Sequence, residues 1–215
     1  MKKIAVVLSG SGVYDGSEIH EATLTLLAIV RNGAQYQCFA PDVEQAHVIN
    51  HLTGQVMPEK RNVLVEAARI ARGNILPLSE YDAEAYAAII FPGGFGAAKN
   101  LSTFAFDGAD CKINPEVEKA VRETLRADKP IGALCISPVL LVKILGGVEV
   151  TIGQDNATID AIEQMGGSHK STTHGGIVVD YKYKVVTSPC YMLDATINQI
   201  ADGAENVVRK ILEIA

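Results

Sequence analysis

The sequence of 215 residues has no tryptophan, few other aromatic residues and no excess of basic side chains. Its 19 Lys and Arg residues stand against 25 Asp and Glu residues, which gives a formal net charge of −6. Because no positive excess offsets phosphate charges, no nucleic-acid partner is expected. No apolar run is long enough to span a bilayer, so no membrane partner is expected either.

The cysteines lack the spacing of a metal site or a disulfide framework. They form no C-x-x-C pair and stand far apart, at Cys38, Cys111, Cys135 and Cys190. We therefore expect neither a zinc ribbon nor a disulfide scaffold, and we expect a protein of the reducing cytoplasm. A Gly-Lys-Ser/Thr phosphate loop is also missing, and the loop at residues 9–16 lacks the third glycine of a dinucleotide fingerprint.

Short apolar runs alternate with helical patterns along the chain. Strands are predicted at residues 3–8, 35–40, 88–91, 130–134, 148–152, 177–180 and 184–187, with the last two as an antiparallel hairpin. Helices are predicted at residues 17–32, 62–72, 115–127, 138–145, 156–165 and 195–213. This alternation predicts one α/β domain over residues 1–215, with a doubly wound, mostly parallel sheet and helices on both faces. Residues 47–60 have weaker periodicity and are interpreted as an insertion or surface hairpin.

In such sheets, ligands bind beyond the carboxyl ends of the strands, and the first helix begins at this edge. Asp15-x-x-Glu18 has the spacing of a capping box, so Glu18 has a structural explanation and is only a secondary site candidate. Glu21 lies one turn further along, on the apolar stripe continued by Leu24 and Ala28. If that stripe faces the sheet, burial raises the pKa of Glu21 toward values useful for proton transfer. If Glu21 lies at the edge of the stripe, it is an ordinary solvated side chain.

The loop after the strand at 88–91 is rich in glycine, with Gly93, Gly94 and Gly96 within five residues. Such a loop leaves backbone amides free to point at an anion, so it is either an oxyanion pocket or an ordinary glycine turn.

A cysteine directly follows the apolar strand at 130–134, and a helix begins near Pro138. This strand–cysteine–helix order predicts a nucleophile elbow, in which the helix N-terminus and an adjacent amide lower the pKa of Cys135. The alternative is a buried, inert thiol, which also fits Cys38 within its apolar strand. Cys111 is interpreted as a loop thiol, and Cys190, in the last loop, is a secondary candidate at the same sheet edge.

The Pro-Gly-Gly-x-Gly-Ala sequence at 92–97, paired with a strand-ending cysteine, resembles the ThiJ/PfpI superfamily, which is related to class I glutamine amidotransferases. Longer stretches at 14–21, 48–54, 93–101 and 191–193 resemble its ElbB subfamily, which is linked to isoprenoid biosynthesis and described as a glyoxalase. The resemblance covers essentially the whole chain. It implies a flavodoxin-like, class I glutamine amidotransferase-like fold and a homodimer.

The resemblance also implies roles for particular residues. Cys135 stands where the superfamily has its nucleophile, and Glu21 matches the glutamate that hydrogen-bonds this cysteine. The backbone amides of Gly94 and Ile136 would form the oxyanion pocket, beside Gly93.

The sequence departs from the superfamily's proteases and amidotransferases. The proteases have a histidine directly after the cysteine, where this chain has Ile136. Amidotransferases need a His-x-Glu pair, which neither His169 nor His174 provides. His20 is next to Glu21 in sequence and either lines the pocket mouth or faces water.

The preferred hypothesis is therefore a cofactor-independent, cysteine-dependent glyoxalase that converts glyoxal or methylglyoxal to glycolate or lactate. The same chemistry would reverse early glycation of proteins or nucleotides. The alternative is a cysteine-based redox sensor with only incidental glyoxalase turnover. A third hypothesis is a non-catalytic, amidotransferase-like partner of a synthase.

Overall fold

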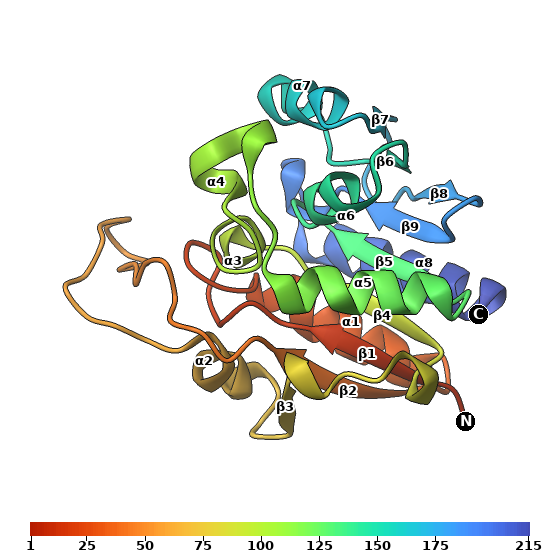
Figure 1. The fold of residues 1–215 in the computed structure, drawn as a ribbon, viewed down its shortest axis with the longest axis horizontal. Coiled ribbons are helices and arrows are strands. Elements are labelled where there is room, and N and C mark those ends of the chain that lie inside the picture. The colour runs from red at the N-terminus through yellow and green to blue at the C-terminus, as the bar shows by residue number, and fades with distance from the viewer.

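A seven-stranded sheet forms the centre of the computed structural model, which describes residues 1–215 (Figure 1). The strand order is β3-β2-β1-β4-β5-β9-β8, and all neighbours pair in parallel except β8 and β9. The strands are β1 (Lys3–Val7), β2 (Gln35–Ala40), β3 (Ile75–Pro77), β4 (Ala88–Phe91), β5 (Ile131–Leu134), β8 (Val178–Asp180) and β9 (Val185–Ser188). This architecture confirms the predicted doubly wound, mostly parallel sheet and the antiparallel hairpin.

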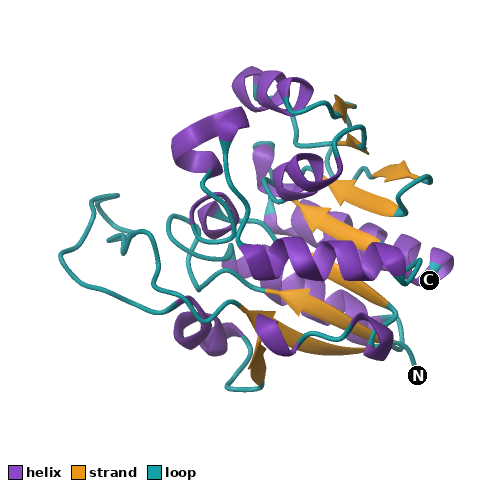
Figure 2. Ribbon diagram, viewed as in Figure 1, coloured by secondary structure: helices purple, strands orange, loops and turns teal.

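Helices cover both faces of the sheet (Figure 2). They are α1 (Ile19–Arg31), α2 (Val63–Ile70), α3 (Phe95–Lys99), α4 (Phe104–Asp107), α5 (Pro115–Arg126), α6 (Pro138–Leu145), α7 (Asn156–Gln164) and α8 (Ile197–Ile214). Helices α1 and α8 pack together on one face, whereas α5 and α6 cover the other. None of these helices combines the length and the apolar character that crossing a membrane requires.

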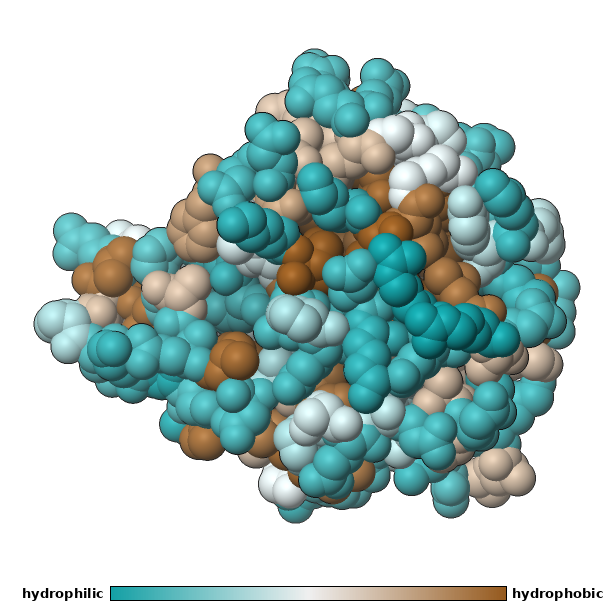
Figure 3. Space-filling model, viewed as in Figure 1, coloured by the Kyte–Doolittle hydropathy of each residue, from teal (hydrophilic) through white to brown (hydrophobic).

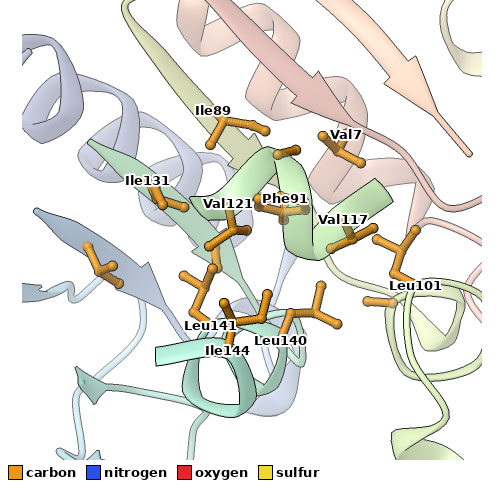
Figure 4. Close-up of a cluster of buried hydrophobic side chains, with 14 of the residues drawn as sticks. Val7, Ile89, Phe91, Leu101, Val117, Val121, Ile131, Leu140, Leu141 and Ile144 are labelled. Atoms are coloured by element: carbon orange, nitrogen blue, oxygen red, sulfur yellow. The ribbon is translucent and has the colours of Figure 1, made fainter. Parts of the chain in front are cut away.

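The two faces of the sheet bury separate apolar cores because neighbouring strand residues point to opposite sides. Ile89 and Phe91 of β4 pack under α5 and α6, where Val121 and Leu140 meet them (Figure 4). Ile90, between them in sequence, faces the core under α1 and α8. Each fully buried side chain of this size contributes about 1.5–3 kcal/mol to folding. These two cores hold the strand ends, and therefore the site residues, in fixed positions.

The prediction of a strand at 148–152 is wrong in its length and in the sheet to which the strand belongs. Only β6 (Glu149–Val150) forms, and it pairs with β7 (Ser168–His169) in a separate two-stranded sheet. The main-sheet position beside β5 belongs to β9, which pairs with it over four residues. Gly146 and Gly153, both with positive φ, interrupt the chain on either side of β6.

The predicted capping box at the start of α1 is also wrong. Glu18 itself is the N-cap, and its carboxylate accepts the Glu21 backbone N–H at 2.7 Å. Asp15 instead accepts the backbone N–H of Ile49 at 2.7 Å. Its carboxylate therefore holds the segment 42–62 against the first loop rather than capping the helix.

The segment 42–62 projects from the body of the molecule as an arm (Figure 1). Ile49 and Val56 form an antiparallel bridge, so its tip is the surface hairpin that was one of the two interpretations. Much of the face in Figure 3 is hydrophilic, and apolar side chains gather in its middle and also on this arm, where Leu52 and Val56 are exposed.

Candidate active site

Cys135 occupies a sharp turn between β5 and α6. Its φ of 59° is in the left-handed region, which costs a residue with a side chain about 1–2 kcal/mol. Two hydrogen bonds hold the turn: the Cys135 N–H donates to the Ser188 carbonyl at 2.9 Å, and Ser137 Oγ donates to the Pro92 carbonyl at 2.7 Å. The predicted strand–cysteine–helix elbow is therefore present in the fold.

Glu21 is fully buried on the face of α1 that meets the sheet. Its Oε2 accepts the Gly93 N–H at 2.9 Å, and its Oε1 accepts the Tyr191 N–H at 3.3 Å. The carboxyl group also shares a hydrogen bond with the Cys135 thiol. Of the two interpretations of Glu21, burial against the sheet is correct.

Burial determines the protonation of this pair. It raises the pKa of Glu21 from 4.5 to about 8, and the charge of Glu18 adds to the increase. Burial also raises the pKa of the Cys135 thiol well above its ordinary value, and a negative charge on Glu21 raises it further. The predicted low pKa of Cys135 is therefore wrong, because desolvation outweighs the effect of the Gly94 amide on the sulfur. At neutral pH both groups are mostly protonated.

The glycine loop between β4 and α3 completes the surroundings of the thiol. Gly93 has no room for a side chain, because a Cβ there would lie 2.5 Å from Glu21 Oε2 and 3.0 Å from Cys135 Sγ. The Gly94 N–H points at the Cys135 sulfur, and the Gly94 φ of 99° suits only glycine. Neither the Gly94 N–H nor the Ile136 N–H donates to another backbone carbonyl or side chain. Two amides are thus free beside the thiol, as an oxyanion pocket requires.

A cavity of about 390 Å³ opens onto Cys135. Glu18, Gly94 and Ile136 line it together with residues that the sequence did not single out as site residues. These are Val13, Phe95, Ala98, Phe104, Ala105, Asp155, Thr158, Tyr191 and Met192. Most of them come from α3, α4, α7 and the loop after β9, so only the fold brings them together.

His20 and Cys190 lie beside this cavity but not in its lining. His20 Nδ1 shares a hydrogen bond of 2.8 Å with Tyr191 Oη and is exposed, so it lies on the rim. Cys190 is buried, has a φ of 44°, and its thiol lies close to Cys135. Parallel pairing of β5 with β9 brings the two cysteines together.

The other candidates lie away from the site. Cys38 is buried within β2, where burial raises its pKa to about 12, which fits the inert-thiol interpretation. Cys111 lies in the loop before α5, as expected, and is also buried. Neither His169 nor His174 lines the cavity. No group of three or more His, Cys, Asp or Glu side chains has the arrangement of a metal site.

Tyr191 is the most informative residue that sequence reasoning missed. It follows Cys190 in the last loop, where its N–H holds Glu21 and its ring lines the cavity. Two features of the sequence could have identified Tyr191 as a site residue. It follows the carboxyl end of a predicted strand, and it belongs to the stretch 191–193 that resembles the family.

Comparisons with known proteins agree with this fold. The chain is 51% identical to the human protein named glutamine amidotransferase-like class 1 domain-containing protein 3, mitochondrial, over 99% of this chain and 83% of that one. It is 50% identical to the rat ES1 protein homolog, mitochondrial, over 99% and 84% of the two chains. The chain belongs to the ES1 family of glutamine amidotransferase-like proteins. No protein-family model matches it.

Solved structures confirm the family resemblance and the class I glutamine amidotransferase-like fold of this ES1-family chain. An isoprenoid biosynthesis protein with amidotransferase-like domain from Ehrlichia chaffeensis is 36% identical, with a TM-score of 0.94 over 100% of this chain and 99% of that one. A ThiJ/PfpI domain protein from Brachyspira murdochii (16% identity, TM-score 0.61, 100% and 98% coverage) shares the fold. So does glyoxalase III from Candida albicans (13% identity, TM-score 0.65, 99% and 97% coverage).

The expected cytoplasmic location is contradicted by these relatives. The human, rat and zebrafish members of the ES1 family are all named as mitochondrial proteins. The inference failed because free cysteines indicate a reducing environment without identifying the compartment that provides it.

Proposed function

We propose that this ES1-family protein is a cofactor-independent glyoxalase that converts a 2-oxoaldehyde and water to a 2-hydroxy acid, with Cys135 as nucleophile. The observation that carries the proposal is the convergence of two groups on the Cys135 sulfur, with a free backbone N–H on the next residue. The Glu21 carboxyl and the Gly94 N–H both contact it, and the unpaired Ile136 N–H is adjacent.

The first step is addition of the Cys135 thiol to the aldehyde carbon. A carbon–sulfur bond forms, the thiol proton moves through Glu21 to the aldehyde oxygen, and a hemithioacetal results. The amides of Gly94 and Ile136 stabilise the negative charge on that oxygen during the addition. Because no proton is gained or lost overall, this step suits a thiol with a raised pKa.

The second step is an internal oxidation and reduction. Glu21 in its carboxylate form removes the proton from the former aldehyde carbon, and an enediol forms. The carboxyl group then returns the proton to the neighbouring carbon, which gives a thioester of the 2-hydroxy acid. Water hydrolyses the thioester and releases the acid and the thiol. A pKa of about 8 allows Glu21 to take up and release protons near neutral pH.

The test uses Cys135→Ser and Glu21→Gln with glyoxal and methylglyoxal as substrates and formation of glycolate or lactate as the readout. We expect Cys135→Ser to lower kcat/KM by at least about 1,000-fold, because it removes the nucleophile. Wild-type turnover by both variants contradicts the proposal. The structural neighbour named glyoxalase III supports only the fold, since it is 13% identical.

We infer a second candidate function, a peroxide-sensitive thiol pair, from the position of Cys190 beside Cys135. A hydroperoxide would oxidise the Cys135 thiol to a sulfenic acid and leave as water or an alcohol. Attack by the Cys190 thiol would then expel a second water and form a disulfide. Burial raises the pKa of both thiols well above the ordinary value, which slows the first step and makes this function the weaker candidate.

Intact-mass measurement after hydrogen peroxide treatment tests the pair. Loss of two hydrogens in the wild type, and accumulation of a sulfenic acid in Cys190→Ser, is the expected result. Equal oxidation of all four cysteines contradicts a dedicated redox function.

A further inference from the structure

The cavity at Cys135 is far larger than glyoxal or methylglyoxal requires. Its volume of about 390 Å³ is more than ten times the roughly 30 Å³ that a water molecule occupies in the liquid. This volume falls within the usual range for pockets that enclose whole small-molecule ligands. A substrate of two or three carbons would leave most of the cavity filled with water.

The walls of the cavity away from the thiol are apolar. Phe95 of α3, Phe104 and Ala105 of α4, Val13 of the first loop and Met192 of the last loop form them. Water in such surroundings has few hydrogen-bond partners, so displacing it with an apolar group is favourable. The polar part of the lining consists of the Gly94 amide beside the reactive sulfur and the side chains of Glu18, Asp155, Thr158 and Tyr191.

The charges at the cavity have a single sign. Its lining includes Glu18 and Asp155 but no Lys, Arg or His. Hydrogen bonds from the side chain and backbone N–H of Thr158 lower the pKa of Asp155, so it is ionised at neutral pH. Lys99 lies outside the lining, where it donates to the Tyr14 carbonyl and faces the Phe95 ring at 5.2 Å from its centroid. An anionic substrate would therefore meet repulsion without a compensating cation.

We propose that the preferred substrates of this site are uncharged 2-oxoaldehydes that carry an apolar alkyl or aryl group larger than methyl. The proposal rests on the glyoxalase function above and adds size and charge selectivity to it. The dicarbonyl end lies at Cys135 and the amides of Gly94 and Ile136, and the apolar group extends along Phe95 and Phe104. Glycated nucleotides, which carry phosphates, are poor substrates on the same argument.

The experiment compares kcat/KM for methylglyoxal, 2-oxohexanal, phenylglyoxal and 4-carboxyphenylglyoxal with the wild-type protein. Each buried methylene adds about 0.8 kcal/mol, or roughly fourfold, so we expect phenylglyoxal and 2-oxohexanal to exceed methylglyoxal by at least about tenfold. We expect the carboxylated probe to be slower than phenylglyoxal, and Asp155→Asn to narrow that difference.

Ala105→Trp tests whether the apolar group occupies the proposed part of the cavity. Ala105 is an exposed residue of α4 that lines the cavity, so an indole there fills space without disturbing a core. We expect this variant to lose the preference for phenylglyoxal over methylglyoxal. Ala85→Trp, at an exposed position outside this cavity, is the matched control and should keep the preference.

The outcomes separate this proposal from the one it rests on. Cys135-dependent turnover of methylglyoxal with an equal or lower kcat/KM for phenylglyoxal overturns the selectivity alone. A faster reaction with the carboxylated probe than with phenylglyoxal overturns the charge argument. Absence of Cys135-dependent turnover of every aldehyde overturns the glyoxalase function itself.

Discussion

Two buried glutamates of this protein have opposite surroundings. Glu66 of α2 is bracketed by two arginines, with Arg69 Nε at 2.8 Å and Arg61 Nη1 at 3.4 Å from its Oε2. Glu21 of α1 has no cation among the groups that set its pKa, and it contacts backbone amides and a thiol instead. The two guanidinium groups therefore compensate a negative charge on Glu66. Glu21 is held in a place where its charge is costly, which is typical of a group that exchanges protons.

The largest expected difference between the two glutamates is in catalytic activity after each is replaced by glutamine. We expect Glu21→Gln to lower kcat/KM for methylglyoxal by about 100- to 10,000-fold, because an amide cannot relay the proton. Glu66→Gln removes another buried carboxylate, outside the site, and its activity should match the wild type. Equal effects of the two substitutions would mean that Glu21 acts only through the fold.

The second largest expected effect is on how the free energy of unfolding changes with pH. The raised pKa keeps Glu21 protonated in the folded chain up to about pH 8, whereas the unfolded chain ionises it near pH 4.5. Between these values the folded state binds more protons, so stability falls as pH rises. We expect Glu21 to lower the free energy of unfolding of the wild type by on the order of a few kcal/mol as the pH rises from about 5 to about 8.

Urea unfolding at several pH values measures this cost as the difference between wild type and Glu21→Gln. Subtracting the two curves removes the contribution of the histidines, which both proteins share. A difference that does not change across this pH range would show that Glu21 is already ionised in the folded protein.

A smaller effect is expected on the alkylation rate of the Cys135 thiol when Glu21 is replaced. Because the charge of Glu21 raises the pKa of Cys135, Glu21→Gln should speed alkylation of Cys135 by about tenfold at pH 8–9. Peptide mass spectrometry measures the rate, with Cys38 as an internal reference and Glu66→Gln as the matched variant. An unchanged rate would show that Glu21 does not act electrostatically on the thiol.

The smallest effect is expected for the stability of Glu66→Gln. Both arginines are partly exposed and regain water when the charge is lost, so the variant should lose only about 0.5–1 kcal/mol. This loss is opposite in sign to the gain expected for Glu21→Gln at pH 8. Urea unfolding measures it, with the exposed Glu80→Gln as a control.

Most of the fold could be predicted from the sequence because each long element has a clear local pattern. The helices around Glu21 and after Pro138 carry apolar stripes, and β4 and β5 are continuous apolar runs. The short helices α3 and α4 were missed because four or five residues, including Gly96, leave no periodicity to detect. The 148–152 strand was misplaced because strand propensity does not specify a pairing partner.

Other expectations have not been tested by the structure or by the comparisons. The homodimer, the single domain over residues 1–215, the catalytic roles of Cys135 and Glu21, and the small dicarbonyl substrate stay predictions. The arm at 42–62 is joined to the first loop through Asp15 and His51, but its role is not assigned.

The position of Cys135 between its strand and its helix follows from the sequence alone, because an apolar run followed by a helix start is a local signal. The sequence also indicated that Glu21 continues the apolar stripe of α1, but left open whether Glu21 is buried, which the packing of α1 on the sheet decides. The protonation of Glu21 and Cys135, in contrast, depends on the complete fold, because every element packed around the pair contributes to its desolvation. The same is true of the apolar cavity and of Cys190 beside Cys135, since residues from α3, α4, α7 and the loop after β9 meet there only when the sheet is complete.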